Sequence, residues 1–154
     1  MIGAKVTLTQ PLSNKRQFVA RTGGGHHFLI DDKDGATGPK PIEIVAAGLA
    51  GCTAFDVISI LRKKRMYVTD YDVQVEADQA AQPPAVFEKV RLHHVVSGVD
   101  IDRKAVEDAI RLSEEKYCSV GAMIHKTAKF DTTFEIREVQ VEEDSPMVVH
   151  GAVR

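Results

Sequence analysis

The chain has 154 residues, a size that favours one domain with a core large enough to fold without disulfide or metal staples. Hydrophobic residues make up 44% and charged residues 27%, the balance of an ordinary globular protein. The formal net charge of −2 leaves no basic excess to meet phosphates, so a nucleic acid is not expected as the main partner.

Neither a membrane span nor a secretory signal is expected. The chain has no unbroken run of eighteen apolar residues, and its first segment, MIGAKVTLTQ, lacks the apolar stretch of a signal peptide. These patterns predict a cytoplasmic protein with no membrane partner. Because cysteines rest reduced in that compartment, Cys52 and Cys118, the two cysteines of the chain, are expected to be free thiols.

The N-terminal part of the chain predicts three strands. AKVTLTQ (4–10) alternates apolar and polar residues, KRQFVART (15–22) follows, and HHFLIDD (26–32) comes after a GGG turn. No GK[ST] sequence follows the glycines, so the turn is not a phosphate loop. The segment DDKDGATGPKP (31–41) is rich in turn residues and predicts a polar loop.

A long helix is predicted over IEIVAAGLAGCTAFDVISILRKKR (42–65). Pro41 suits its first position, and Glu43 suits the positive end of the helix dipole. The first half is apolar on all sides, which is typical of a buried helix, and its small residues would let another element pack closely. The basic stretch LRKKRMY (61–67) is interpreted as a solvated helix end, with an anion or partner site as the alternative.

The remaining pattern predicts two strands, a helix with a short further helix, and a last strand. The strand over 86–96 would place Val90, Leu92, His94 and Val96 on one face. The order βββ-α-ββ-α-β predicts an α+β domain over 1–138, built on an antiparallel sheet with a long central helix. A C-terminal tail over 139–154 follows it.

Two interpretations stay open for each cysteine: a small core residue, or half of a thiol pair. Cys52 lies well inside the predicted long helix, where the dipole does little for a thiolate. Asp56, one turn later on the same face, would disfavour the thiolate unless a cation intervenes. Cys118 lies between the second helix and the short one, and the two cysteines can bridge only if their Cα atoms come within about 7 Å.

Glu43 precedes Cys52 by nine residues, so a straight helix places it on the opposite face and about 13 Å away along the axis. Glu43 therefore either complements the dipole or serves a site formed with another chain. The pairs His26–His27 and His93–His94 are adjacent in strands and point to opposite faces, so no metal site is expected there. No CxxC motif supports zinc.

Three segments together resemble the OsmC/Ohr family of hydroperoxide-reducing proteins, and most of all its YhfA-like branch. They are GPKPIEIVAAGLAGCTAFDVISILRKKRM (38–66), PPAVFEKVRLHHVVSG (83–98) and RLSEEKYCSVGAMI (111–124). The resemblance extends to about Ile136. It implies an OsmC-like fold in an intertwined homodimer, with the central helix packed against its mate and the site at the interface.

The resemblance also implies an activity, that of a thiol-dependent peroxidase acting on organic hydroperoxides. Cys52 would be the peroxidatic cysteine and Cys118 the resolving one. A dithiol reductant, possibly of the lipoyl type, would restore both thiols, with no metal or bound cofactor. A non-catalytic dimer that binds a small apolar ligand and a redox sensor of the same fold are the alternatives.

In this family a glutamate and an arginine hold the first thiolate. Glu43 matches the glutamate or lies beside it, and Arg21 is the nearest match for the arginine, with Arg16 second. As a plain strand residue, Arg21 would be solvated. The sequence departs from the family pattern at Ile42, where other branches have a glutamate after the proline, and at Ser119, where a proline often follows the second cysteine.

Overall fold

The structure, a computed structural model, describes residues 1–9, 16–32 and 37–140. A first sheet contains β1 Ala4–Leu8, β2 Phe18–Thr22 and β3 His27–Ile30, and a second contains β4 Tyr67–Gln79, β5 Phe87–Val99 and β6 Lys129–Glu138. The helical elements are α1 Pro41–Lys63, α2 Arg103–Leu112, the π-helical turn η1 Ser113–Tyr117 and α3 Ser119–Ile124. The α+β class and the order of the elements agree with the prediction, and η1 is an addition to it. The predicted tail lies outside the described residues from residue 141 on.

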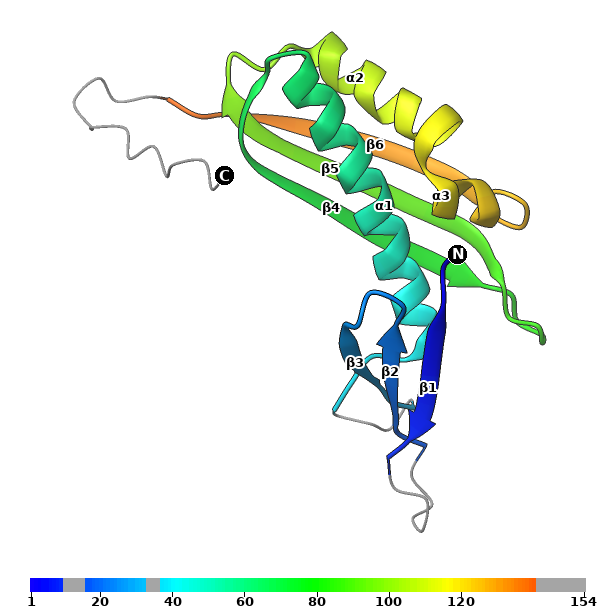
Figure 1. The fold of residues 1–154 in the computed structure, drawn as a ribbon. Helices are drawn as coiled ribbons and strands as arrows, with labels where there is room; N and C mark the ends of the chain where they lie inside the picture. The colour runs from blue at the N-terminus through cyan, green and yellow to red at the C-terminus, as the bar shows by residue number, and fades with distance from the viewer. Residues whose placement is uncertain (10–15, 33–36, 141–154) are drawn as a thin grey trace.

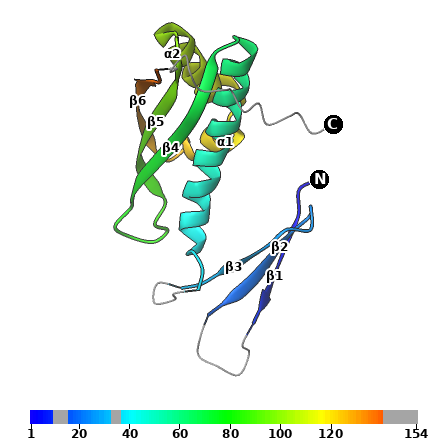
Figure 2. The ribbon, with the colours of Figure 1, turned by 90° about the vertical axis from the view of Figure 1, so that its left-hand side faces the viewer.

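The molecule has two separate layers of strands joined by α1. The helices α1, α2 and α3 lie on one face of the β4–β5–β6 sheet (Figure 1). The β1–β2–β3 sheet stands beyond the N-terminal end of α1, away from the second sheet in both views (Figure 2). The core of the protomer therefore lies between the second sheet and the helices.

The sheet prediction needs one correction. Neighbouring strands run antiparallel in the first sheet and in the β4–β5 pair, but β5 and β6 run parallel. Parallel neighbours require a crossover connection, and α2, η1 and α3 supply it on the covered face of the sheet. A purely antiparallel sheet is therefore wrong for β6.

The long helix α1 is only partly buried, contrary to the expectation from its apolar first half. Leu49, Thr53, Val57 and Leu61, spaced four residues apart, form its buried face. Only 22% of the most apolar eighteen-residue stretch of α1 is buried, and Phe55 is 77% exposed. By length and composition alone α1 is apolar enough to cross a membrane, although the chain has no unbroken run of eighteen apolar residues. A large apolar surface of α1 is thus left uncovered in the single chain.

Strand β5 lies at the centre of the core, and the prediction that four of its residues share one face is confirmed. Val90, Leu92, His94 and Val96 share its covered face, and each is at most 2% exposed. Two buried clusters meet there. One lies near the C-terminal end of α1 and includes Val57, Leu61, Val96, Ile101, Ala105, Val106, Ala109 and Ile110. The other includes Leu49, Phe87, Val90, Leu92, Cys118, Ile124 and Ala128, and partly buried Cys52 packs against it.

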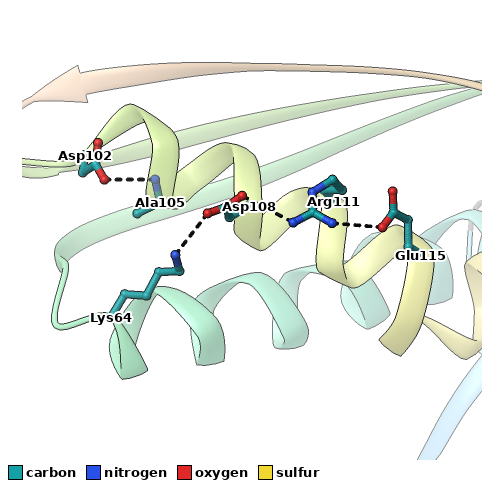
Figure 3. A network of polar contacts seen from close by, with 6 residues as sticks. All are labelled: Lys64, Asp102, Ala105, Asp108, Arg111 and Glu115. Atoms are coloured by element: carbon teal, nitrogen blue, oxygen red, sulfur yellow. Dashed lines mark hydrogen bonds and ion pairs between the residues drawn. The ribbon is translucent and has the colours of Figure 1, made fainter.

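Polar contacts tie α2 to the C-terminal end of α1 (Figure 3). Asp102 caps α2 by accepting a hydrogen bond from the backbone N–H of Ala105 at 3.2 Å. Lys64 Nζ lies 3.4 Å from Asp108 Oδ2, and Arg111 contacts both Asp108 and Glu115. Of these contacts the Lys64–Asp108 pair joins α2 to the end of α1, and exposed ion pairs of this kind add little free energy each.

Substitution of Gly98 would test how closely the end of β5 packs against its neighbours. A Cβ at this position would overlap the carbonyl oxygen of Tyr67 and come within 2.7 Å of Ile101 Cδ1. We expect Gly98→Ala to lower the free energy of unfolding by about 1–3 kcal/mol, because backbone atoms of β4 must shift. Denaturant unfolding followed by circular dichroism measures this. Gly24→Ala, whose Cβ would meet only ordinary contacts, should stay within about 0.5 kcal/mol of the wild type. Equal stabilities would contradict the packing.

Candidate thiol site

Cys52 lies in the middle of α1, on the flank of the buried face. Thr53 next to it and Leu49 one turn before it are each 1% exposed, whereas Cys52 itself is half-buried. Its thiol is free, and its Sγ lies 4.0 Å from the hydroxyl of Ser119 at the start of α3. The helix therefore holds Cys52 at the edge of the core, partly exposed to solvent.

The π-helical turn η1 positions Cys118 directly before α3. The backbone N–H of Cys118 donates a hydrogen bond to the carbonyl oxygen of Ser113 at 2.8 Å. This i→i+5 bond makes the turn after α2 one residue longer than an α-helical turn. Cys118 then caps α3, and its Sγ accepts a hydrogen bond from the backbone N–H of Gly121 at 3.2 Å. Its side chain is buried and its thiol is free. The turn thus aims this sulfur inward, toward α1.

The two sulfurs meet beside a carboxylate. Cys52 Sγ, Cys118 Sγ and an oxygen of Asp56 all lie within 4.8 Å of one another. Asp56 is held in place by the hydroxyl of Ser113, which donates to its Oδ2 at 3.0 Å. The hydroxyl of Thr53 lies 3.1 Å from that of Ser113, so it can donate in turn. The structure therefore confirms that Asp56 shares the helix face of Cys52, and it adds Cys118 to the same group.

The surroundings make the two thiols unequal. Burial raises the pKa of the Cys118 thiol to about 12. Burial is the largest cause of this value, a hydrogen bond with Cys52 and the electrostatic effects of Cys52 and Asp56 contribute to it, and the N–H of Gly121 partly opposes the rise. Cys118 is therefore a neutral thiol at physiological pH, and Cys52 is the more accessible sulfur of the pair.

A buried polar pair continues from Asp56 into the sheet. The Tyr71 hydroxyl lies 2.7 Å from His94 Nδ1, and burial raises the pKa of Tyr71, with the nearby charge of Asp56 adding to the rise. Burial lowers the pKa of His94 to about 4, so its ring is neutral, and the tautomer sets whether Nδ1 or the Tyr71 hydroxyl donates the hydrogen bond between them. Its Nε2 has no hydrogen-bond partner among the described residues. Sequence reasoning placed His94 on the apolar face but gave no signal of this pairing.

Glu43 lies outside this group within one protomer. It belongs to the first turn of α1, where its Oε2 accepts the backbone N–H of Lys40 at 2.8 Å and its Oε1 lies 3.4 Å from Lys40 Nζ. The hydrogen bond from Lys40 lowers the pKa of Glu43, so the carboxylate is charged. Nine residues of straight helix separate it from Cys52 by about 13 Å. Within the protomer, Glu43 caps its own helix.

The arginine candidates lie on the N-terminal sheet. Arg21 is exposed on β2, in register with Lys5 and His27 and therefore on the same polar face of the sheet. Arg16 is also exposed and forms an ion pair with Asp32 at 3.1 Å. Neither has a described contact with Cys52 or Cys118, so the structure brings together the two cysteines but not the predicted glutamate and arginine.

The cluster of Cys52, Asp56 and Cys118 also has the donor types of a metal site, which the sequence search did not find. That search looked for histidines and closely spaced cysteines, and His26, His27 and His93 are not part of this cluster. The spacing of Cys52 and Asp56, one helical turn apart, was a usable signal. The third member is distant in sequence and is joined only by the packing of α3 against α1.

Comparisons with known proteins assign the chain to a family. The family model described as OsmC-like protein matches residues 32–133. Protein YhfA of Escherichia coli (strain K12) is 37% identical over 119 residues, which are 77% of this chain and 89% of that protein.

Solved structures show the same fold. A hypothetical protein from Aquifex aeolicus VF5 is similar with a TM-score of 0.79 and 26% identity, covering 91% of this chain and 98% of that chain. The organic hydroperoxide resistance protein OhrB of Bacillus subtilis is similar with a TM-score of 0.58 and 16% identity, covering 88% of this chain and 98% of that chain. With its long central helix, two small sheets and two neighbouring cysteines, this chain belongs to the OsmC-like family.

Proposed function

We propose that the protein is a thiol-dependent peroxidase that reduces organic hydroperoxides, with Cys52 as the attacking thiol and Cys118 as the resolving thiol. The observation that carries the proposal is the geometry of the pair. The two sulfurs lie within 4.8 Å, but only Cys52 is partly open to solvent. A hydroperoxide from solvent would therefore contact Cys52 first. The neutral thiol of Cys118 is buried next to it.

The reaction balances with thiols alone. The thiolate of Cys52 attacks the outer peroxide oxygen, the O–O bond breaks, and the alcohol leaves with one proton, so Cys52 becomes a sulfenic acid. The thiol of Cys118 then attacks the sulfenic sulfur, and its proton leaves with the hydroxyl group as water. The resulting disulfide is reduced by an external dithiol through exchange. The cytoplasm, where thiols are kept reduced, suits this cycle.

A second copy of the chain is the partner we propose for the uncovered apolar surface. Cβ atoms built at Gly48 and Gly51 of α1 would meet nothing within 4 Å, so that side of the helix is open to another chain. A groove of about 340 Å³ between α1 and β4 is lined by exposed Phe55 and by Ile58. In the N-terminal sheet only Ala20 is a buried hydrophobic residue, so that sheet also needs a partner.

A two-fold dimer would let residues of one chain serve the thiol of the other. Glu43 cannot contact Cys52 of its own straight helix, and Arg21 lies on a separate sheet. In an isologous dimer both act across the interface at equivalent sites. We therefore assign Glu43, and Arg21 with it, to orienting and stabilising the partner's attacking thiolate.

Rapid mixing with cumene hydroperoxide tests the roles of the two cysteines. We expect the reduced wild type to lose two free thiols per chain, Cys118→Ser to lose its one thiol as a sulfenic acid, and Cys52→Ser to keep its thiol. The measurement is free-thiol counting over time, with the sulfenic acid trapped by dimedone. If both wild-type thiols persist for minutes, the protein is a binding dimer and not a peroxidase.

The pH dependence of alkylation tests the buried state of the resolving thiol. In Cys52→Ser, the rate of reaction of Cys118 with iodoacetamide should still rise with pH up to about pH 10, because burial, the largest cause of its raised pKa, remains and only the thiolate reacts. At about pH 8 the reaction should be at least about tenfold slower than that of an exposed thiol. The same variant unfolded in urea is the control, and its rate should level off above about 8.5. A folded protein that levels off there would have an ordinary thiol at Cys118.

Mixed dimers test whether Glu43 acts across the interface. Homodimers of Cys52→Ser and of Glu43→Gln should both reduce peroxide slowly. A mixed dimer of the two carries one intact Cys52 opposite one intact Glu43, so it should regain about half of the wild-type rate if the two residues come from different chains. Single-turnover kinetics on dimers purified by two affinity tags measure this. No recovery would place Glu43 and Cys52 of one chain in the same site.

A further inference from the structure

Cys52, Asp56 and Cys118 form a three-donor cluster that the peroxidase cycle does not fully use. Two of the donors come from consecutive turns of α1 and the third from the cap of α3, so none lies on a loose loop. Their sulfur and oxygen atoms lie within 4.8 Å of one another. Ligands of one tetrahedral Zn²⁺, with bonds of about 2.3 Å to sulfur and about 2.0 Å to oxygen, are themselves about 3.5–4 Å apart. Small side-chain rotations therefore bring the three donors onto one cation.

Hydrogen bonds from neighbouring residues already orient two of these donors, Asp56 and Cys118. The hydroxyl of Ser113 holds Asp56 Oδ2, which leaves the other carboxylate oxygen available, and the backbone N–H of Gly121 holds Cys118 Sγ. Such outer contacts fix ligands and are part of metal sites. Within residues 1–9, 16–32 and 37–140, the recorded ion pairs and hydrogen bonds join no lysine or arginine to these three donors. A cation at this point would meet the carboxylate of Asp56 and would displace the protons of the two thiols.

We propose that the reduced site binds one soft divalent cation of the Zn²⁺ class through Cys52 Sγ, Cys118 Sγ and an oxygen of Asp56, with the fourth position open to water or an external thiol. Two thiolates with one carboxylate suit Zn²⁺, Cd²⁺ or Co²⁺ and disfavour Mg²⁺ and Ca²⁺. Binding replaces two thiol protons by one cation, so it weakens as the pH falls. The same sulfurs form the proposed disulfide, so the metal-bound and oxidised states exclude each other.

The test is an anaerobic titration of the reduced, chelator-stripped full-length protein with Co²⁺ and with Cd²⁺. One equivalent per chain should produce the visible bands of tetrahedral Co²⁺ and the ultraviolet band of two Cd²⁺–thiolate bonds. Asp56→Asn should lower the affinity by at least about tenfold, the smallest loss seen for outer-shell partners, and keep the two-thiolate band. Cys118→Ser should halve that band.

The matched control is Asp72→Asn, which makes the same charge change at an exposed position of β4 and should bind like the wild type. Affinities that are equal in Asp56→Asn and Asp72→Asn, or a stoichiometry well below one, would overturn the site. The inference is independent of the peroxidase proposal, because peroxide reduction is measured with a chelator present and metal binding without peroxide. Cd²⁺-loaded protein should lose its thiols to peroxide at least about tenfold more slowly than the chelated form. Where the chelated form does react with peroxide, equal rates would contradict shared sulfurs.

Discussion

The packing of the η1–α3 corner against the middle of α1 is the contact on which the whole site depends. Cys118 and Cys52 are sixty-six residues apart in sequence, and only this contact makes them neighbours. The π-helical turn ends α2 and redirects the chain, and Gly121 lies so close behind that a Cβ there would be 3.2 Å from Cys118 Sγ. Without that corner, α1 would carry a lone half-buried cysteine.

The same packing buries one thiol, raises its pKa, and leaves the other partly exposed. Cys118 is enclosed by apolar residues and beside Asp56, so its neutral form is favoured, while Cys52 at the edge of the core stays accessible. A peroxidase needs this asymmetry, since one sulfur must meet the substrate and the other must be kept from it. The carboxylate of Asp56 works against a second negative charge, so any state with two thiolates requires a compensating cation.

The single chain has a buried core, but part of its apolar surface is exposed. The apolar side of α1 and the N-terminal sheet are uncovered, and Glu43 and Arg21 belong to these uncovered regions. The symmetric partner proposed above would account for both facts, because it would cover the apolar surface and bring Glu43 and Arg21 to the thiol site. With the two proposals for the thiol pair taken together, its states would be reduced, disulfide-bonded and metal-bound.

Much of the fold follows from local patterns. The order of the elements was predicted from alternation in the strands, from Pro41 and Glu43 at the start of α1, and from the cap at Asp102. The family motifs identified Cys52 and Cys118 as the candidate thiols. The antiparallel prediction failed for β6, because local patterns carry no information about the direction in which a crossover returns. The burial of α1 was misjudged as well, since composition cannot tell which sides meet another element.

The sequence by itself determined the elements, the apolar face of β5 and the shared helix face of Cys52 and Asp56, because these depend on residue spacing along one strand or helix. Tertiary structure alone decided that Cys118 reaches that face, that its pKa rises, and that Tyr71 pairs with His94. Each of these depends on which distant segments pack together and on how completely they exclude water, and no periodicity in the chain encodes that.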